Sequence, residues 1–433
     1  MTTGMTGTTG ATGKVPAPPG APEHTSGRIS PLRRTPLRLF LVCLVILVAA
    51  VPWRRGAFYT GGTDAVVVLK AALTLAAFGL VVMAPSRGVP WSRLRAGPVT
   101  WLVLYLGIAT AGAFLADEAL ASLVLAARLT LLTATIVLLF RRYPSDLVLS
   151  ALTGAMLALA LVSGATGVGS LASEGRLYGG IPPTNANEIA LLVSVPLLCL
   201  AWRTVQRMAR AVETVAILPL VGVLWLTGTR TGLAAVALGL VLLVAMAPRI
   251  PVPVAVTGVL AVPVLLYLTF WTPLLSSYLT RGDSAGILTL NSRTVAWSAA
   301  LDYPDTMVEW LLGHGLSVKV IPVSALYRNE QMLDSTWISA LVQAGVLGSA
   351  VLALLVLTTL VRVLTVAQPL RPLLLATLVV LTVTSWLESG MFDTSVTFIA
   401  FLAFTMTAQE TGHQTGPATA PETGPAIDAG RSA

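Results

Sequence analysis

The residues best suited to chemistry lie in the one long polar interruption of an otherwise apolar chain, between Trp271 and Asp334. Arg293 lies within it, and its planar guanidinium suits phosphate oxygens. His314 follows, and an imidazole suits proton transfer near neutral pH. Asp334 stands where the next apolar run begins, and its carboxylate suits the removal of a proton from a hydroxyl group. Because long loops are commonly functional, the segment predicts an anion site with an acid–base group beside it.

Two short turns each hold one further arginine. Arg176 precedes a stretch rich in Gly and Pro, which predicts a tight turn with Asn185 or Asn187 capping the next helix but leaves the arginine itself unexplained. Arg230 lies in the turn Thr227–Gly232, between two apolar runs. Its side chain either snorkels to the membrane surface or binds an anion such as phosphate.

The polar segment predicts two short helices, one starting near Asn291 and one running from about Pro304 to Gly313. Arg293 is placed in the first turn of the first helix, where the helix dipole disfavours a cation unless an anion lies nearby. The alternatives stay open for each candidate. Arg293 is an anion ligand or a solvated side chain, His314 a proton shuttle or a surface residue, and Asp334 a base or a helix cap.

The composition places the chain in a membrane. Of its 433 residues, 55% are hydrophobic and only 11% are charged, whereas soluble domains carry roughly 25% charged residues. The two cysteines, Cys43 and Cys199, lie inside apolar runs, and no Cys or His spacing suits a zinc site or a disulfide framework. We therefore expect neither a metal nor another cofactor.

The hydropathy pattern predicts an all-α, polytopic membrane bundle of about twelve transmembrane helices, since a span needs about 20 mostly apolar residues. One large external loop, residues 272–334, contains the short helices. The tails 1–36 and 409–433 are predicted to be disordered and cytoplasmic, which leaves 37–408 as the membrane domain. The predicted spans are 37–52, 64–84, 99–116, 119–140, 146–168, 186–202, 211–227, 231–247, 251–271, 335–361, 372–387 and 393–408.

The arginines set the predicted orientation. Most of those in short loops fall on one side of the membrane, the side shared by both termini, and positive charge favours the cytoplasm. The chain is thus predicted to cross the cytoplasmic (inner) membrane many times, with both termini inside and the long loop outside. The basic balance is a topology signal, so no nucleic-acid partner is expected. Lys70 and Arg128 fall within spans and should face the bundle interior.

Together these segments resemble the O-antigen ligase/polymerase superfamily of bacterial cell-envelope enzymes. The resemblance covers most of residues 37–408, and each motif is weak alone while their order is fairly specific. Where ligases of the family tend to show His-Asn, this chain has Asp334–Ser335, which favours a polymerase. The matching segments are Arg176 with its Gly–Pro–Asn stretch, Thr227–Gly232, Arg293 with Trp297 and Ala300, Gly313–His314–Gly315, and Asp334–Ile338 with Gly345 and Gly348.

The resemblance implies a metal-independent glycosyltransferase that polymerises or ligates a glycan carried on undecaprenyl diphosphate, at the outer side of the cytoplasmic membrane. Arg230 and Arg293 would hold the diphosphate and Arg176 would assist. Asp334 or His314 would be the base, or leaving-group departure would make a base unnecessary. Its partners would be a lipid-linked glycan donor, a glycan acceptor and membrane lipid. The main alternative is a transporter or flippase of lipid-linked sugars, although no two-fold hydropathy repeat is visible; a non-catalytic scaffold accounts poorly for the outer arginines.

Overall fold

The computed structural model describes residues 37–53, 65–85, 97–247, 291–323 and 330–413. The predicted span 251–271 lies outside these residues, as do the tail 1–36 and most of the tail 409–433. The elements in chain order are α1 (Leu37–Ala50), α2 (Ala65–Val82), α3 (Gly97–Leu115), α4 (Ala119–Arg142), α5 (Ser145–Thr166), α6 (Ser170–Glu174), α7 (Ala186–Val205), α8 (Ala211–Val215), α9 (Ile217–Leu226), α10 (Arg230–Ala245), α14 (Asn291–Leu301), α15 (Met307–Leu312), β1 (Val320–Pro322), β2 (Glu330–Met332), α16 (Thr336–Thr365), α17 (Arg371–Leu387) and α18 (Val396–His413).

The helices are those of a membrane protein. Within the described residues, six are long and apolar enough to cross a membrane: α2, α3, α4, α5, α7 and α16. Every predicted span in the described ranges coincides with a helix, except that 211–227 is divided between α8 and α9. Several of these helices, including α1, α10 and α17, are shorter than a full span. The helical membrane class is therefore confirmed, while the total of about twelve spans stays a prediction.

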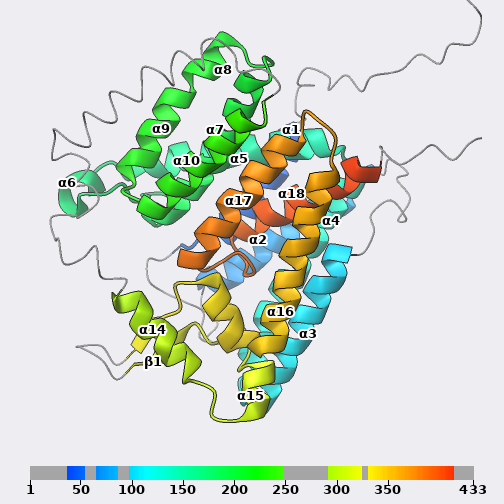
Figure 1. The fold of residues 1–433 in the computed structure, drawn as a ribbon, viewed down its shortest axis with the longest axis vertical. Helices are drawn as coiled ribbons and strands as arrows, with labels where there is room; N and C mark the ends of the chain where they lie inside the picture. The colour runs from blue at the N-terminus through cyan, green and yellow to red at the C-terminus, as the bar shows by residue number, and fades with distance from the viewer. Residues whose placement is uncertain (1–36, 54–64, 86–96, 248–290, 324–329, 414–433) are drawn as a thin grey trace, which may run out of the picture.

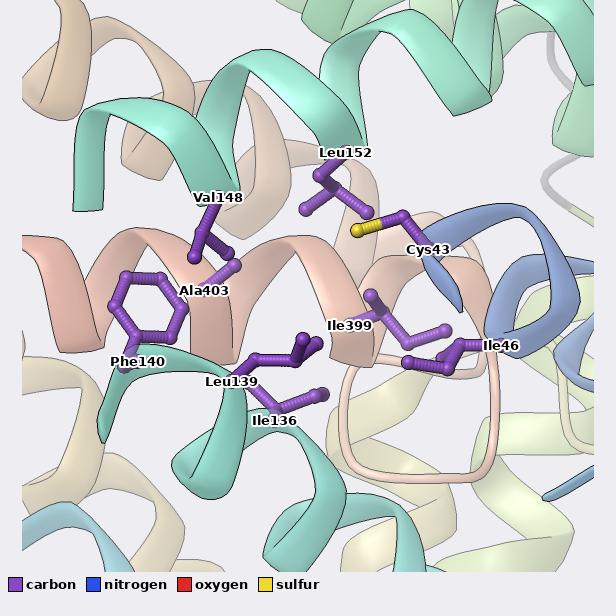
Figure 2. A pocket seen from close by; sticks show the side chains of 9 residues that line it. All are labelled: Cys43, Ile46, Ile136, Leu139, Phe140, Val148, Leu152, Ile399 and Ala403. Atoms are coloured by element: carbon purple, nitrogen blue, oxygen red, sulfur yellow. The ribbon is translucent and has the colours of Figure 1, made fainter. Parts of the chain in front are cut away.

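The most deeply buried helix is α18, in which Phe398, Phe401 and Leu402 are at most 1% exposed. It contacts α16, α17, α4, α5 and α7, while α16 packs along α3 and α10 along α17 (Figure 1). The packing leaves an apolar void of about 10 Å³ between α1, α4, α5 and α18, into which Cys43 and its neighbours point (Figure 2). That volume is at the lower limit for one water molecule and has no polar group to hold it, so the void is a packing defect.

The polar segment folds into α14, α15 and a small hairpin, grouped at one end of the bundle (Figure 1). The two short helices were predicted, and Gly313, with φ 71°, ends the second one. The antiparallel hairpin of β1 and β2 was not predicted, but it is a small addition to a fold that is otherwise all-α. Its strands are three residues long, too short to leave an alternating pattern in the sequence.

A glycine breaks α16 into two helical segments. Gly345 has φ 64° and ψ −166°, a conformation that is essentially restricted to glycine. The break frees the carbonyl groups of Val342 and Gln343, which accept hydrogen bonds from the backbone N–H groups of His314 and Gly315, both at 2.9 Å. The loop segment Gly313–Gly315 therefore docks into the kink, which gives its glycines a structural reason.

We predict that Gly345→Ala destabilises the protein by about 1–3 kcal/mol, the range for a strained backbone conformation. A Cβ at this position would also collide with the backbone of Leu311. Gly107→Ala in α3 is the control, because no atom lies within 4 Å of the methyl group that this substitution would add. Thermal unfolding in detergent should give a lower Tm for Gly345→Ala than for Gly107→Ala; equal values would contradict the strain argument.

Candidate functional site

The two short turns that carry Arg176 and Arg230 form one structural unit. The Nε of Arg176 donates to the carbonyl oxygen of Thr227 at 2.9 Å, and its guanidinium lies 5.6 Å from the ring centroid of Tyr178. Gly228 has φ 63° at this contact, and a Cβ there would lie 3.2 Å from the Arg176 side chain. The turn around Gly228 therefore fixes Arg176 beside the start of α10.

Asn187 connects this unit to the far end of the chain. Asn185 caps α7 and forms a capping box with Glu188, which leaves the side chain of Asn187 available. Its Oδ1 accepts from Arg176 Nη2 at 3.4 Å and from Thr229 Oγ1 at 3.1 Å. Its Nδ2 donates to Glu388 Oε1 at 2.5 Å. Of the two predicted caps, Asn185 is thus the cap and Asn187 belongs to the site.

Glu388 is the residue that the sequence interpretation missed. It is the C-cap of α17, and its Oε1 also receives Arg293 Nη2 at 3.4 Å, with 27% of the arginine side chain and 30% of the glutamate side chain exposed. Arg293 comes from α14, so this ion pair attaches the loop helix to the bundle. The available signal was a carboxylate at the predicted outer end of a span.

Two carboxyl groups in the cluster hold their protons more tightly than usual. The pKa of Glu388 is raised to about 7, mainly by burial and to a smaller extent by the nearby Asp334, while the Asn187 hydrogen bond and the cations Arg293 and Arg176 oppose the rise. Burial also raises the pKa of Asp334, and Arg293 opposes that rise. The electrostatic coupling of both carboxyl groups to Arg293 places Asp334 in the same cluster.

Arg230 lies at the edge of this cluster as the first residue of α10. Its neighbour Thr229 donates to Asn187. The Arg230 Nε is buried and has no hydrogen-bond partner among the described residues. Buried polar atoms are nearly always paired, so an orphaned guanidinium N–H indicates room for an acceptor such as a phosphate oxygen or an ordered water.

The two predicted bases are placed differently. Asp334 does not cap α16: the N-cap is Ser335, which makes no side-chain capping bond, so the helix-cap alternative is wrong. His314 lies away from the arginines in its contacts, with Nε2 3.4 Å from Glu309 Oε2 and its ring centroid 4.6 Å from that of Tyr303. The structure therefore brings Arg176, Arg293 and Asp334 together around Asn187 and Glu388. Arg230 is placed beside them only through its chain neighbour Thr229, and the described contacts of His314 do not reach them.

A second charged pair, Lys319 and Asp393, lies beside a small cavity. Lys319 Nζ is 2.6 Å from Asp393 Oδ2, beside a cavity of about 30 Å³ that Thr336 and Gln343 also line. The cavity has room for one or two water molecules.

Two further predictions concern the interior and metals. Lys70 and Arg128 are half-buried, and Arg128 Nη2 donates to the carbonyl oxygen of Ala49 at 2.7 Å; that both face the bundle interior stays a prediction. Within the described ranges, no group of three or more His, Cys, Asp or Glu side chains could hold a metal ion.

The raised pKa of Glu388 predicts a pH-dependent stability. The folded carboxyl group binds its proton up to about pH 7, above the ordinary value of 4.5, so the free energy of unfolding should fall as pH rises between these values. The Glu388→Gln variant should lack this part of the fall. Thermal unfolding of both proteins from pH 4.5 to 8 tests this; parallel curves would contradict it.

No protein-family model and no curated protein matches the chain. We therefore propose a function from the geometry of the arginine cluster.

Proposed function

We propose that the protein is a membrane glycosyltransferase that polymerises or ligates a glycan carried on undecaprenyl diphosphate, on the outer side of the cytoplasmic membrane, in the synthesis of a cell-surface polysaccharide. The observation that carries the proposal is the gathering of Arg176 and Arg293 around Asn187 and Glu388, with Arg230 following Thr229, which also binds Asn187. The resemblance implies that these three arginines, from distant segments of the chain, hold the diphosphate. The resemblance to the O-antigen ligase/polymerase superfamily supplies the donor class.

The cluster has the chemistry that diphosphate departure requires. In glycosyl transfer the bond from the anomeric carbon to the diphosphate oxygen breaks, and negative charge accumulates on the leaving group. Preorganised cations at a site of partial burial stabilise such charge more strongly than water does. Arg230 supplies an unpaired Nε, and Arg293 can exchange its long 3.4 Å contact with Glu388 for a phosphate oxygen.

The position of the cluster on the helices fits an outer site. Asn187 is in the first turn of α7, and Arg203 is near the other end of this helix. At 1.5 Å per residue the two are about 24 Å apart, most of the thickness of a hydrocarbon core. The predicted orientation makes Arg203, in a short loop after an apolar run, a cytoplasmic residue, and on that prediction the cluster is at the outer side of the membrane.

We propose an enzyme and not a flippase because the cluster combines arginines with two carboxyl groups of raised proton affinity, Glu388 and Asp334. A flippase must release the same lipid intact, and no bond to carbon changes. Asp334 and His314 stay predictions for the base. The acceptor is a hydroxyl group of another glycan, and its identity decides between polymerase and ligase.

We predict that Arg230→Ala and Arg293→Ala each reduce chain extension by about 10²–10³-fold, the effect of removing one preorganised donor to a developing anion. Arg176→Ala should act in the same direction. The matched control is Arg203→Ala, since Arg203 also pairs with a carboxylate, Glu213, at 2.9 Å. Polymer length on the cell surface and the amount of protein in the membrane are the measurements; wild-type lengths in both cluster variants would refute the diphosphate assignment.

The reaction should proceed without a divalent metal ion. We predict that the purified protein consumes a lipid-linked repeat unit in the presence of EDTA and forms a new glycosidic bond. Longer lipid-linked chains would identify a polymerase, and transfer to another acceptor a ligase. Movement of intact donor across the bilayer with no new bond would favour the flippase, and activity restored only by a divalent cation would contradict the metal-free mechanism.

A further inference from the structure

Glu388 uses only one of its two carboxylate oxygens for the bonds that hold the cluster. Oε1 receives both Asn187 Nδ2 and Arg293 Nη2. Oε2 accepts no hydrogen bond from the residues that the structure describes, although 30% of the side chain is exposed. An ionised carboxylate has acceptor capacity for about four hydrogen bonds, so this oxygen can receive a donor that arrives with the substrate.

The backbone of Glu388 is held on both sides. Its N–H donates to the carbonyl oxygen of Thr384 at 2.8 Å, and its carbonyl oxygen accepts from Thr336, from the backbone N–H at 3.2 Å and from Oγ1 at 2.8 Å. The residue thus joins the end of α17 to the start of α16. A group used in proton transfer needs such support from rigid elements, because its efficiency depends on geometry within a few tenths of an ångström.

Its surroundings also suit proton transfer. The hydrogen-bond partners of its side chain are the neutral amide of Asn187 and the guanidinium of Arg293. The Arg293 contact, at 3.4 Å, is longer than the 2.9 Å contact between Arg203 and Glu213. With its pKa raised to about 7, the carboxyl group changes its charge near neutral pH, which is the range in which a general base is most effective. His314 lacks this placement, because its contacts run to Glu309 and Tyr303.

We propose that Glu388 is the catalytic base that removes the proton from the acceptor hydroxyl group, an assignment that rests on the glycosyl transfer proposed above. The acceptor proton moves to Oε2 as the hydroxyl oxygen forms its bond to the anomeric carbon. The bond from that carbon to the diphosphate oxygen breaks, and its electron pair stays on the diphosphate, held by the arginines. Glu388 then releases the proton to water. The products are the extended glycan, undecaprenyl diphosphate and one proton.

Arg293 couples the binding of the diphosphate to the proton affinity of Glu388. Its contact with Glu388 lowers the proton affinity of the free carboxylate. When Arg293 turns to the diphosphate, Glu388 loses that opposing cation and gains an anion nearby. Both changes raise its affinity for a proton. Donor binding therefore prepares the base for the acceptor.

The test is Glu388→Gln, which keeps the size of the side chain and an oxygen for Asn187 and Arg293. We expect polymer formation to fall by about 10²-fold or more, the contribution of general-base catalysis. Binding of undecaprenyl diphosphate to the protein in nanodiscs should be retained, because the arginines are intact. Glu213→Gln is the matched control: Glu213 is also an arginine-paired carboxylate, and this variant should polymerise like the wild type.

The pH dependence separates a base from a structural residue. Wild-type kcat/KM for the donor should rise with pH through about 7, the pKa of Glu388 in the empty site, and this limb should be absent from the residual activity of Glu388→Gln. If Glu388→Gln does not fold, Glu388→Asp takes its place, and its limb should be shifted.

The outcomes are distinguishable. Wild-type turnover in Glu388→Gln with donor binding intact would overturn the base while leaving the glycosyltransferase in place. An unshifted limb in Glu388→Asp would do the same. A wild-type protein that neither binds undecaprenyl diphosphate nor extends a glycan would overturn both proposals.

Discussion

The site depends on one carboxylate oxygen. Glu388 Oε1 receives the amide of Asn187 and the guanidinium of Arg293, and through these two bonds the ends of α7, α14 and α17 meet. Asn187 extends the connection to Arg176 and to Thr229 at the start of α10. Each bond is modest by itself, but in a partly buried network the loss of one member leaves the others unsatisfied, which costs more than the bond contributed.

Much of the architecture was accessible from the sequence because hydropathy and charge report directly on the membrane. The helical class, the places of the described spans and the two short loop helices follow from apolar runs, helix-start patterns and a terminating glycine at Gly313. The hairpin of β1 and β2 did not follow, since strands of three residues carry too little pattern. The kink at Gly345 was also hidden, because a glycine in an apolar helix reads the same whether or not its φ is positive.

The sequence identified the arginines of the site but not the hydrogen bonds that join them to other residues. Arg176, Arg230 and Arg293 were singled out because topology did not explain them, and Asp334 because it stands at the mouth of a span. Asp334 was also a plausible cap, and only the structure shows Ser335 in that position. Glu388 stands just past the end of a span and has no motif around it. Glu388 belongs to the site because it binds Asn187, which is 201 positions away in the sequence. No local sequence pattern indicates such a pairing. The glycines beside His314 have a structural role that the sequence did not indicate: Gly313 packs against the kink in α16, and Gly315 against Ser122 and Ala113.

The charges of the cluster connect binding to chemistry. Three arginines face two carboxyl groups, Glu388 and Asp334, so the empty site keeps an excess of positive charge when both are ionised. A diphosphate diester brings two negative charges, which turns that excess into a slight deficit. Low local polarity makes such a deficit costly, and the least costly correction is the uptake of one proton by the carboxyl group that already holds it most tightly. Glu388 is that group, with its pKa at about 7. In the proposed reaction, the acceptor hydroxyl group supplies the proton that restores neutrality, so the arginines that bind the donor also favour the attack of this hydroxyl group on the donor.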